Sequence, residues 1–150
     1  MDTHSIRSLR QVFESMEPPD LDTLVGTYRR EYVGPAWLRR LAGLTLGLTV
    51  LRGWWGKDFP SPGRCENLVS RGGTIERVLP VEVVQAVSLL DGKMGITLAY
   101  SSDGPRPYRW VVDELRLTPT GSLLGMVVPV RRWLPRLALP FMLHPIDQEG

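Results

Sequence analysis

Cysteine and histidine are scarce in this chain of 150 residues, which has one cysteine and two histidines. Cys65 has no partner for an intrachain disulfide and no second thiolate for a metal site, so we expect a small buried or half-buried residue. His4 and His144 lie near opposite ends of the sequence, whereas a zinc site needs about three or four clustered ligands. Nothing in the sequence supports a Ser-His-Asp triad. We predict no metal and no cofactor.

A strong excess of charge of one sign is also lacking. The chain carries 18 Lys and Arg against 16 Asp and Glu, which gives a formal net charge of +2. Lysines are few, and the arginine pairs 29–30, 39–40 and 131–132 are scattered along the sequence. A nucleic-acid-binding surface gathers such residues on one face. We therefore predict no nucleic-acid partner.

The sequence also shows no signal-peptide pattern and no apolar segment long enough to span a membrane. The N-terminal Met-Asp-Thr-His has neither the basic nor the apolar region of a signal peptide. The longest apolar run, Leu41–Leu51, is about half the length that a membrane-spanning helix needs. These features predict a cytoplasmic protein with no membrane span.

What is present fits a single domain. A hydrophobic share of 43% over 150 residues is enough for one core, and no internal repeat or linker is visible. We divide the domain 1–150 into an N-terminal helix and linker (1–20), a first part (22–59) and a β-meander part (60–143).

Residues 5–16 have the periodicity of an amphipathic helix. Ile6, Leu9, Phe13 and Met16 recur at helical spacing, and Ser5 is a suitable N-terminal cap. The prolines at 18 and 19 end the segment. We expect this helix to pack across the end of a barrel; the alternative is that it mediates a homodimer.

Residues 22–33 are typical of a first strand, which Gly34-Pro35 ends. Pro35 suits the first position of a helix. The positions that follow form a helical stripe, although residues 44–50 also alternate as a strand would. We favour a helix to about residue 50. The stripe consists of Trp37, Leu41, Leu44, Leu48 and Leu51.

From residue 66 the pattern is that of β-strands. Asp91-Gly92, between two β-rich runs, predicts a tight two-residue hairpin. We expect the apolar run 133–143 to cover the barrel as a short irregular or helical segment, with Arg131-Arg132-Trp133 closing one end. The predicted fold class is mainly β, an antiparallel calycin-like barrel or half-barrel with an N-terminal helix and a helical insertion after the first strand. The predicted strand runs are 67–71, 74–79, 81–90, 94–101, 108–117 and 123–130.

The sequence resembles a bacterial family in its motif order. Gly26-Thr27-Tyr28-Arg29, then a Gly-Pro and a leucine-rich segment, then Trp55-Gly56-Lys57-Asp58-Phe59 resemble the GXWXG-type domain, with Tyr28 in place of its first tryptophan. The stretch from Arg71-Gly72-Gly73 to Leu124-Gly125-Met126 is similar to the uncharacterised companion domain of that family. The family implies no chemistry. A looser similarity to calycins and fatty-acid-binding proteins implies an architecture only.

The two-residue period sorts side chains by face. Tyr100 shares a face with Ile96 and Leu98, and Asp113 lies among Val111 and Leu115. We therefore predict that both polar groups face the interior, with Asp113 and Tyr100 as candidate catalytic residues. The alternative is a structural ion pair in which Lys57 or an arginine holds Asp113.

The same parity places Gln85 in the interior, and it predicts that Glu114 and Arg116 form a solvated surface pair. The aromatic residues at 54, 55, 108 and 110 either stack on a planar ligand or belong to the core and the barrel rim. Lys57 either anchors an anionic head group or is an exposed residue at the start of a strand. The predicted ligand-binding residues are Tyr28, Trp55, Lys57, Gln85, Tyr108, Trp110 and Met126.

Two expectations concern the segment around Gly56. We expect Trp55 to be more buried than Lys57, and we expect Gly56 to be required for a close backbone approach or a positive φ.

These features favour a small β-barrel that binds an apolar or aromatic small molecule in its interior. The alternative is a cofactor-free cyclase or isomerase that acts on a polyketide-like substrate in the same cavity. A third and weaker interpretation is an interaction protein that uses its N-terminal helix.

Overall fold

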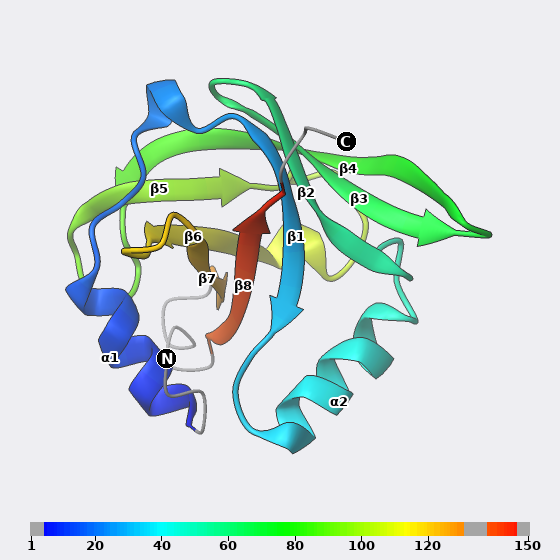
Figure 1. Ribbon diagram of the computed structural model, residues 1–150, viewed down its shortest axis with the longest axis horizontal. Coiled ribbons are helices and arrows are strands. Elements are labelled where there is room, and N and C mark those ends of the chain that lie inside the picture. The colour runs from blue at the N-terminus through cyan, green and yellow to red at the C-terminus, as the bar shows by residue number, and fades with distance from the viewer. Residues whose placement is uncertain (1–4, 131–137, 147–150) are drawn as a thin grey trace.

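The computed structural model describes residues 5–130 and 138–146, which form a closed antiparallel barrel of eight strands in sequential order (Figure 1). Each strand pairs with the next, and β1 pairs with β8 to close the barrel. The predicted fold class is thereby confirmed. The strands are β1 (Gly26–Tyr32), β2 (Trp54–Ser61), β3 (Arg64–Arg71), β4 (Thr74–Val87), β5 (Met94–Ala99), β6 (Val111–Leu117), β7 (Leu123–Pro129) and β8 (Leu139–Pro145).

Two α-helices accompany the barrel, and both were expected, although the second ends at Leu46 and not near residue 50. Helix α1 (Ile6–Ser15) starts at Ser5, whose hydroxyl accepts a hydrogen bond from the Ser8 backbone at 2.9 Å. Helix α2 (Ala36–Leu46) follows β1 and lies beside one end of the barrel (Figure 1). Two short 3₁₀ turns, η1 (Leu21–Thr23) and η2 (Tyr108–Trp110), precede β1 and β6.

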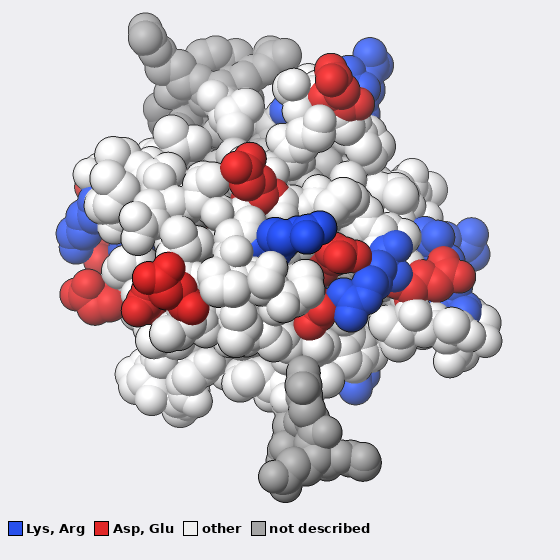
Figure 2. Space-filling view, turned by 90° about the horizontal axis from the view of Figure 1, so that it is seen from above, with Lys and Arg blue, Asp and Glu red and all other residues white. Residues whose placement is uncertain are grey.

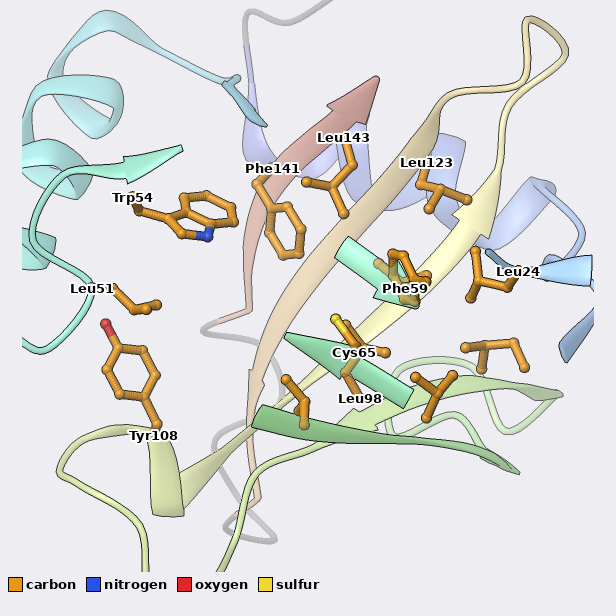
Figure 3. Close-up of a cluster of buried hydrophobic side chains, with 14 of the residues drawn as sticks. Leu24, Leu51, Trp54, Phe59, Cys65, Leu98, Tyr108, Leu123, Phe141 and Leu143 are labelled. Atoms are coloured by element: carbon orange, nitrogen blue, oxygen red, sulfur yellow. The ribbon is translucent and has the colours of Figure 1, made fainter. Parts of the chain in front are cut away.

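The core has two compartments separated by the barrel wall. Inside the barrel, Leu98, Leu115 and Leu123 belong to a cluster of buried apolar side chains (Figure 3). Outside it, Leu9 and Phe13 of α1 cover the outer face of β7 and β8 and pack in a second cluster. Helix α1 therefore buries its apolar face on its own barrel, but on the outer wall of β7 and β8 and not across the barrel end, as residues 5–16 were expected to do.

Buried charged residues lie under α1 on the outer wall. Arg116 is 1% exposed, and its guanidinium donates to the carbonyl oxygens of Phe13 at 3.2 Å and Met16 at 3.1 Å. It also pairs with Asp91 Oδ1 at 3.0 Å. Arg116 thus satisfies the Met16 carbonyl at the end of α1 and adds a second donor to the Phe13 carbonyl, which also accepts from the Met16 backbone.

The neighbouring carboxylate of Glu114 is buried as well. It accepts hydrogen bonds from the Ser88 hydroxyl and from the Leu89 backbone, the latter at 2.8 Å. The prediction of a solvated pair is therefore wrong, because α1 and the 88–93 loop cover the outer face of β6. We call Arg116, Asp91, Glu114 and Ser88 the outer cluster.

A β-bulge changes the sidedness of β2. Trp54 pairs with Val69 and Gly56 pairs with Leu68, so one extra residue is inserted between them. As a result Trp54 and Lys57, three residues apart, both lie on the inner side, where each is buried. Trp55 is more exposed than Lys57, which reverses the prediction.

Gly56 confirms the expected close approach. A Cβ at this position would overlap the carbonyl oxygen of Tyr28 on β1. Its φ is not positive, so the steric fit across the β1–β2 pair, and not backbone conformation, requires glycine here.

Three details of the meander differ from the prediction. Strand β4 continues through Pro80, because a register shift between Glu66 and Asn67 accommodates the interruption. The β4–β5 connection spans residues 88–93 and is longer than a two-residue turn, although Gly92 does adopt a positive φ of 74°. Residues 139–145 form β8 instead of an irregular cover. The Arg131-Arg132-Trp133 contact lies outside the described residues.

Candidate ligand cavity

A cavity of about 250 Å³ lies between α2 and the adjacent end of the barrel. Its walls are largely apolar. Helix α2 contributes Leu38, Ala42 and Leu46, and the barrel contributes Trp54 and Phe141. An apolar space with few polar groups is the usual form of a small-molecule site.

Three polar side chains meet at the inner wall of this cavity. The Lys57 ammonium lies 3.1 Å from Asp113 Oδ2 and donates to the Tyr100 hydroxyl at 3.0 Å. Tyr100 in turn donates to Asp113 Oδ2 at 2.8 Å. Lys57, Tyr100 and Asp113 all border the cavity. The sequence-based placement of Asp113 and Tyr100 in the interior is confirmed, and Lys57 is the cationic residue that pairs with Asp113.

Asn67 completes the surroundings of Lys57. Its side-chain oxygen accepts from the ammonium at 2.7 Å, and its amide nitrogen donates to the Leu79 carbonyl at 3.0 Å. An ammonium has three donors, and three oxygens now surround it. The cation is therefore satisfied by the protein itself. We call Lys57, Tyr100, Asp113 and Asn67 the inner cluster.

Burial and charge set the protonation of this cluster. Burial acts to lower the pKa of Lys57, but Tyr100 and Asp113 outweigh it, so the pKa lies above its usual value. Burial together with the Asp113 charge raises the pKa of Tyr100. Burial also raises the pKa of the nearby Cys65 thiol to about 12. Lys57 is thus charged, Tyr100 is a neutral donor, and Cys65 is an unreactive thiol.

One polar atom of the cavity wall has no partner. Trp54 is 7% exposed, and its indole N–H makes no hydrogen bond within the described structure. In Figure 3 the indole nitrogen is on the edge of the ring that faces Leu51 and Tyr108, which also line the cavity. The Lys57 ammonium lies 5.6 Å from the centre of the same ring.

Tyr108 is a further predicted site residue that lines the cavity. Its ring packs against Tyr100 with centroids 5.5 Å apart, and its hydroxyl shares a 2.8 Å hydrogen bond with Thr49. Thr49 lies just after α2. This bond therefore ties the segment after the helix to the barrel at the edge of the cavity.

The other predicted ligand residues lie outside the cavity lining. Tyr28 is half-buried and packs edge-to-face on Phe59 with ring centroids 5.6 Å apart. Trp55 lies under the Arg29 guanidinium, 5.2 Å from the ring centre. Gln85 is exposed, so its predicted interior position is wrong.

Trp110 and Met126 are also misplaced by the prediction. Trp110 is 43% exposed and lies 5.5 Å from the Arg106 guanidinium. Met126 is fully buried, but in the outer compartment beneath α1. Sequence reasoning also missed Asn67 and Thr49, and it selected Trp55 over Trp54. Only the bulge before Gly56, which period-2 counting cannot detect, distinguishes the two tryptophans.

Within residues 5–130 and 138–146, no group of three or more His, Cys, Asp or Glu side chains is placed to hold a metal ion. No helix in these ranges is long and apolar enough to cross a membrane.

The fold and cavity define a closed antiparallel β-barrel with an internal apolar space. The chain is similar to a solved crystal structure of a protein from Thermomonospora curvata, with a TM-score of 0.71 and 19% identity over 95% of this chain and 88% of that chain. This similarity shows the fold alone. No protein-family model and no curated protein matches the chain, so the resemblance to the GXWXG-type family stays a prediction.

Proposed function

We propose that the barrel binds a neutral, largely apolar small molecule that carries a hydrogen-bond acceptor. The unpaired indole N–H of Trp54 is the observation that carries this proposal. Buried polar groups in native proteins nearly always have partners, and an unsatisfied donor costs about 1–3 kcal/mol. A carbonyl or ether oxygen of a ligand in the cavity would remove that cost.

The inner cluster supports a neutral ligand over an anionic one. Asp113 balances the charge of Lys57, and three protein oxygens surround the ammonium. A ligand carboxylate would have to displace one of these oxygens, and it would bring a second negative charge close to Asp113. The earlier interpretation of Lys57 as an anchor for an anionic head group is therefore not the one we propose.

Three probes of similar shape test this proposal by calorimetry. They are 2-acetylnaphthalene, 2-ethylnaphthalene and 2-naphthoate. We expect the ketone to bind about tenfold more tightly than the hydrocarbon, because one added hydrogen bond contributes about 1 kcal/mol or more. The carboxylate should bind most weakly.

Trp54→Phe should remove the preference for the ketone, because phenylalanine keeps an aromatic ring and lacks the donor. Trp55→Phe is the matched control on the outer surface, and it should keep the preference. The proposal is wrong if no probe binds, or if Trp54→Phe preserves the ratio of ketone to hydrocarbon affinity.

A second candidate function is a cofactor-free isomerase or cyclase that acts on a polyketide-like substrate. The observation that favours it is the presence of Lys57, Tyr100 and Asp113 on the cavity wall. In this proposal Tyr100 donates a hydrogen bond to a substrate carbonyl, and Asp113 removes a proton from the adjacent carbon. The resting geometry favours binding over catalysis, because both groups already satisfy each other.

Hydrogen–deuterium exchange of the methyl group of 2-acetylnaphthalene separates the two candidates. An enzyme of this class accelerates exchange next to the carbonyl, and Asp113→Asn loses that acceleration while the ketone still binds. A simple binding protein leaves the exchange rate at its value in buffer.

A further inference from the structure

Helix α2 has an apolar stripe that faces solvent. Trp37, Leu41, Leu44 and Leu48 are 61%, 50%, 73% and 90% exposed. At 100° per residue Trp37, Leu41 and Leu44 fall within an arc of about 60° on the helix. Leu48 follows in the turn after α2. The sequence pattern placed these four positions on a helical stripe together with Leu51, which the structure buries in the core. The structure leaves the four exposed positions without a covering element among the described residues.

The adjoining side of α2 is apolar as well. Leu38, Ala42 and Leu46 face the cavity, and Leu41, at the edge of the stripe, also lines it. A helix that is apolar on two sides is normally buried on both, and exposed patches of this kind mark interaction sites. One side of α2 therefore closes the cavity, and the other side lacks its partner.

The charge around the stripe indicates the chemistry of that partner. Residues 33–57 contain no Asp or Glu. They contain three exposed arginines, Arg39, Arg40 and Arg52. The face shown in Figure 2, at the end of the molecule away from α2, instead carries Lys and Arg interspersed with Asp and Glu. The segment that contains α2 thus combines large exposed apolar side chains with arginines and no carboxylate of its own.

We propose that α2 docks on an anionic lipid bilayer, with the stripe at the boundary between headgroups and acyl chains and the arginines against lipid phosphates. Apolar stripes flanked by basic residues bind such interfaces, and each arginine near an anionic leaflet strengthens binding. A second copy of the chain fits less well, because its own 33–57 segment supplies no carboxylate to these arginines.

This inference deepens the proposed function and rests on it in one respect. Because α2 also lines the cavity, the bilayer is the source from which the apolar ligand enters or to which it is delivered. Docking itself depends only on the outer side of the helix.

Co-sedimentation with phosphatidylcholine vesicles, prepared with and without phosphatidylglycerol, tests the docking. We expect at least about tenfold tighter binding to the anionic vesicles, weakened by added salt because the attraction is screened. The double variant Leu44→Glu, Leu48→Glu should abolish vesicle binding. Arg39→Gln with Arg40→Gln should remove the preference for phosphatidylglycerol.

Ile75→Glu is the matched control, since Ile75 is a 45% exposed apolar residue on β4, outside the stripe. It should bind vesicles as the parent does. Equal loss in this control, or no binding of the parent to anionic vesicles, overturns the proposal. So does a dimer in size-exclusion chromatography that Leu44→Glu, Leu48→Glu dissociates without any vesicle binding.

The calorimetric probes keep the two proposals distinguishable. Leu44 and Leu48 do not line the cavity, so the double variant should bind 2-acetylnaphthalene as the parent does. Ketone binding without vesicle binding defeats the docking proposal alone. Vesicle binding without ketone binding defeats the proposed function alone.

Discussion

The inner and outer clusters are two solutions to the same problem, a cation buried to 1% exposure on each side of one barrel wall. In the inner cluster Lys57 meets three side-chain oxygens and borders a cavity. In the outer cluster Arg116 meets one carboxylate and the backbone carbonyls of Phe13 and Met16, and it does not line the cavity beside α2. Arginine suits the second task, because its planar fork reaches several acceptors at once.

The difference shows that burial of charge has two separate uses here. The outer cluster joins α1 to the barrel, and its loss would release a helix. The inner cluster forms the polar part of an otherwise apolar cavity wall. Because water can enter the cavity, removing one side chain of this cluster should cost less stability than removing a side chain of the outer cluster. Stability measurements on single variants should therefore separate the clusters.

Arg116→Met should have the largest effect. It leaves the buried Asp91 carboxylate without its cation and the Met16 carbonyl without its Arg116 donor, so we expect a loss of about 3–5 kcal/mol in the free energy of unfolding. Urea denaturation measures it. Arg64→Met, at an exposed position on β3, is the control and should change stability by less than about 0.5 kcal/mol. A small effect at Arg116 would remove the proposed distinction between the clusters.

Asp113→Asn should cost less, about 1–3 kcal/mol, the cost of leaving a buried polar group poorly satisfied. Lys57 keeps Asn67 and Tyr100 as partners, and the cavity gives water access to the cluster. The same denaturation experiment applies. If Asp113→Asn destabilises the protein as much as Arg116→Met, water in the cavity does not reduce the cost of the substitution. The inner cluster would then stabilise the fold as strongly as the outer cluster.

Tyr100→Phe should have a smaller effect, about 1 kcal/mol, because it deletes a bridging hydroxyl and leaves the Lys57–Asp113 pair in place. Tyr108→Phe is the comparison within the same cavity, since its hydroxyl contacts only Thr49 among the described residues. An effect at Tyr100 larger than that of Asp113→Asn would show that the hydroxyl, and not the ion pair, holds the inner cluster together.

The smallest expected effect is a dependence on acid pH that arises in the outer cluster. Burial acts to raise the pKa of Asp91, but hydrogen bonds from Arg116 and the Lys93 backbone, with the Arg116 charge, lower it on balance. The native state then binds fewer protons than the unfolded state, so this stabilisation is present above the unfolded pKa of about 4 and is lost as pH falls through the folded value.

Asp91→Asn should make the free energy of unfolding depend less on pH between pH 6 and about 3. Midpoints of urea denaturation measure this dependence. Asp103→Asn, at an exposed position in the loop after β5, should leave the curve unchanged. An unchanged acid limb in Asp91→Asn would mean that the Arg116–Asp91 pair is not linked to folding.

Local patterns were sufficient to predict most of the fold. The spacing of Leu9 and Phe13 after Ser5 specified α1, and alternation across 94–100 and 111–117 correctly placed Tyr100 and Asp113 inside the barrel. Both are consequences of backbone geometry acting over a few residues. The sequence therefore predicted that Tyr100 and Asp113 lie on the inner side of the barrel wall, although not their hydrogen-bond partners.

The predictions failed where a segment distant in the sequence, or a β-bulge, determines whether a side chain is buried. Arg116 and Glu114 lie on the outer face, as their parity required, but α1 covers that face from about a hundred positions away in the chain. Gln85 has the parity of Val83 and is still exposed, since period-2 counting does not say how far the covered part of a strand extends. Trp54 and Trp55 exchanged roles because the bulge inserts one residue.

That bulge has a consequence for the search for related chains. Inward positions of β2 follow a spacing of three between Trp54 and Lys57 and a spacing of two between Lys57 and Phe59. A search pattern that assumes strict alternation would align Trp55 with the cavity and discard true relatives. The signature to look for is an inward tryptophan, one free position, a glycine and then a lysine, followed later in the chain by a tyrosine just after β5 and an aspartate on β6.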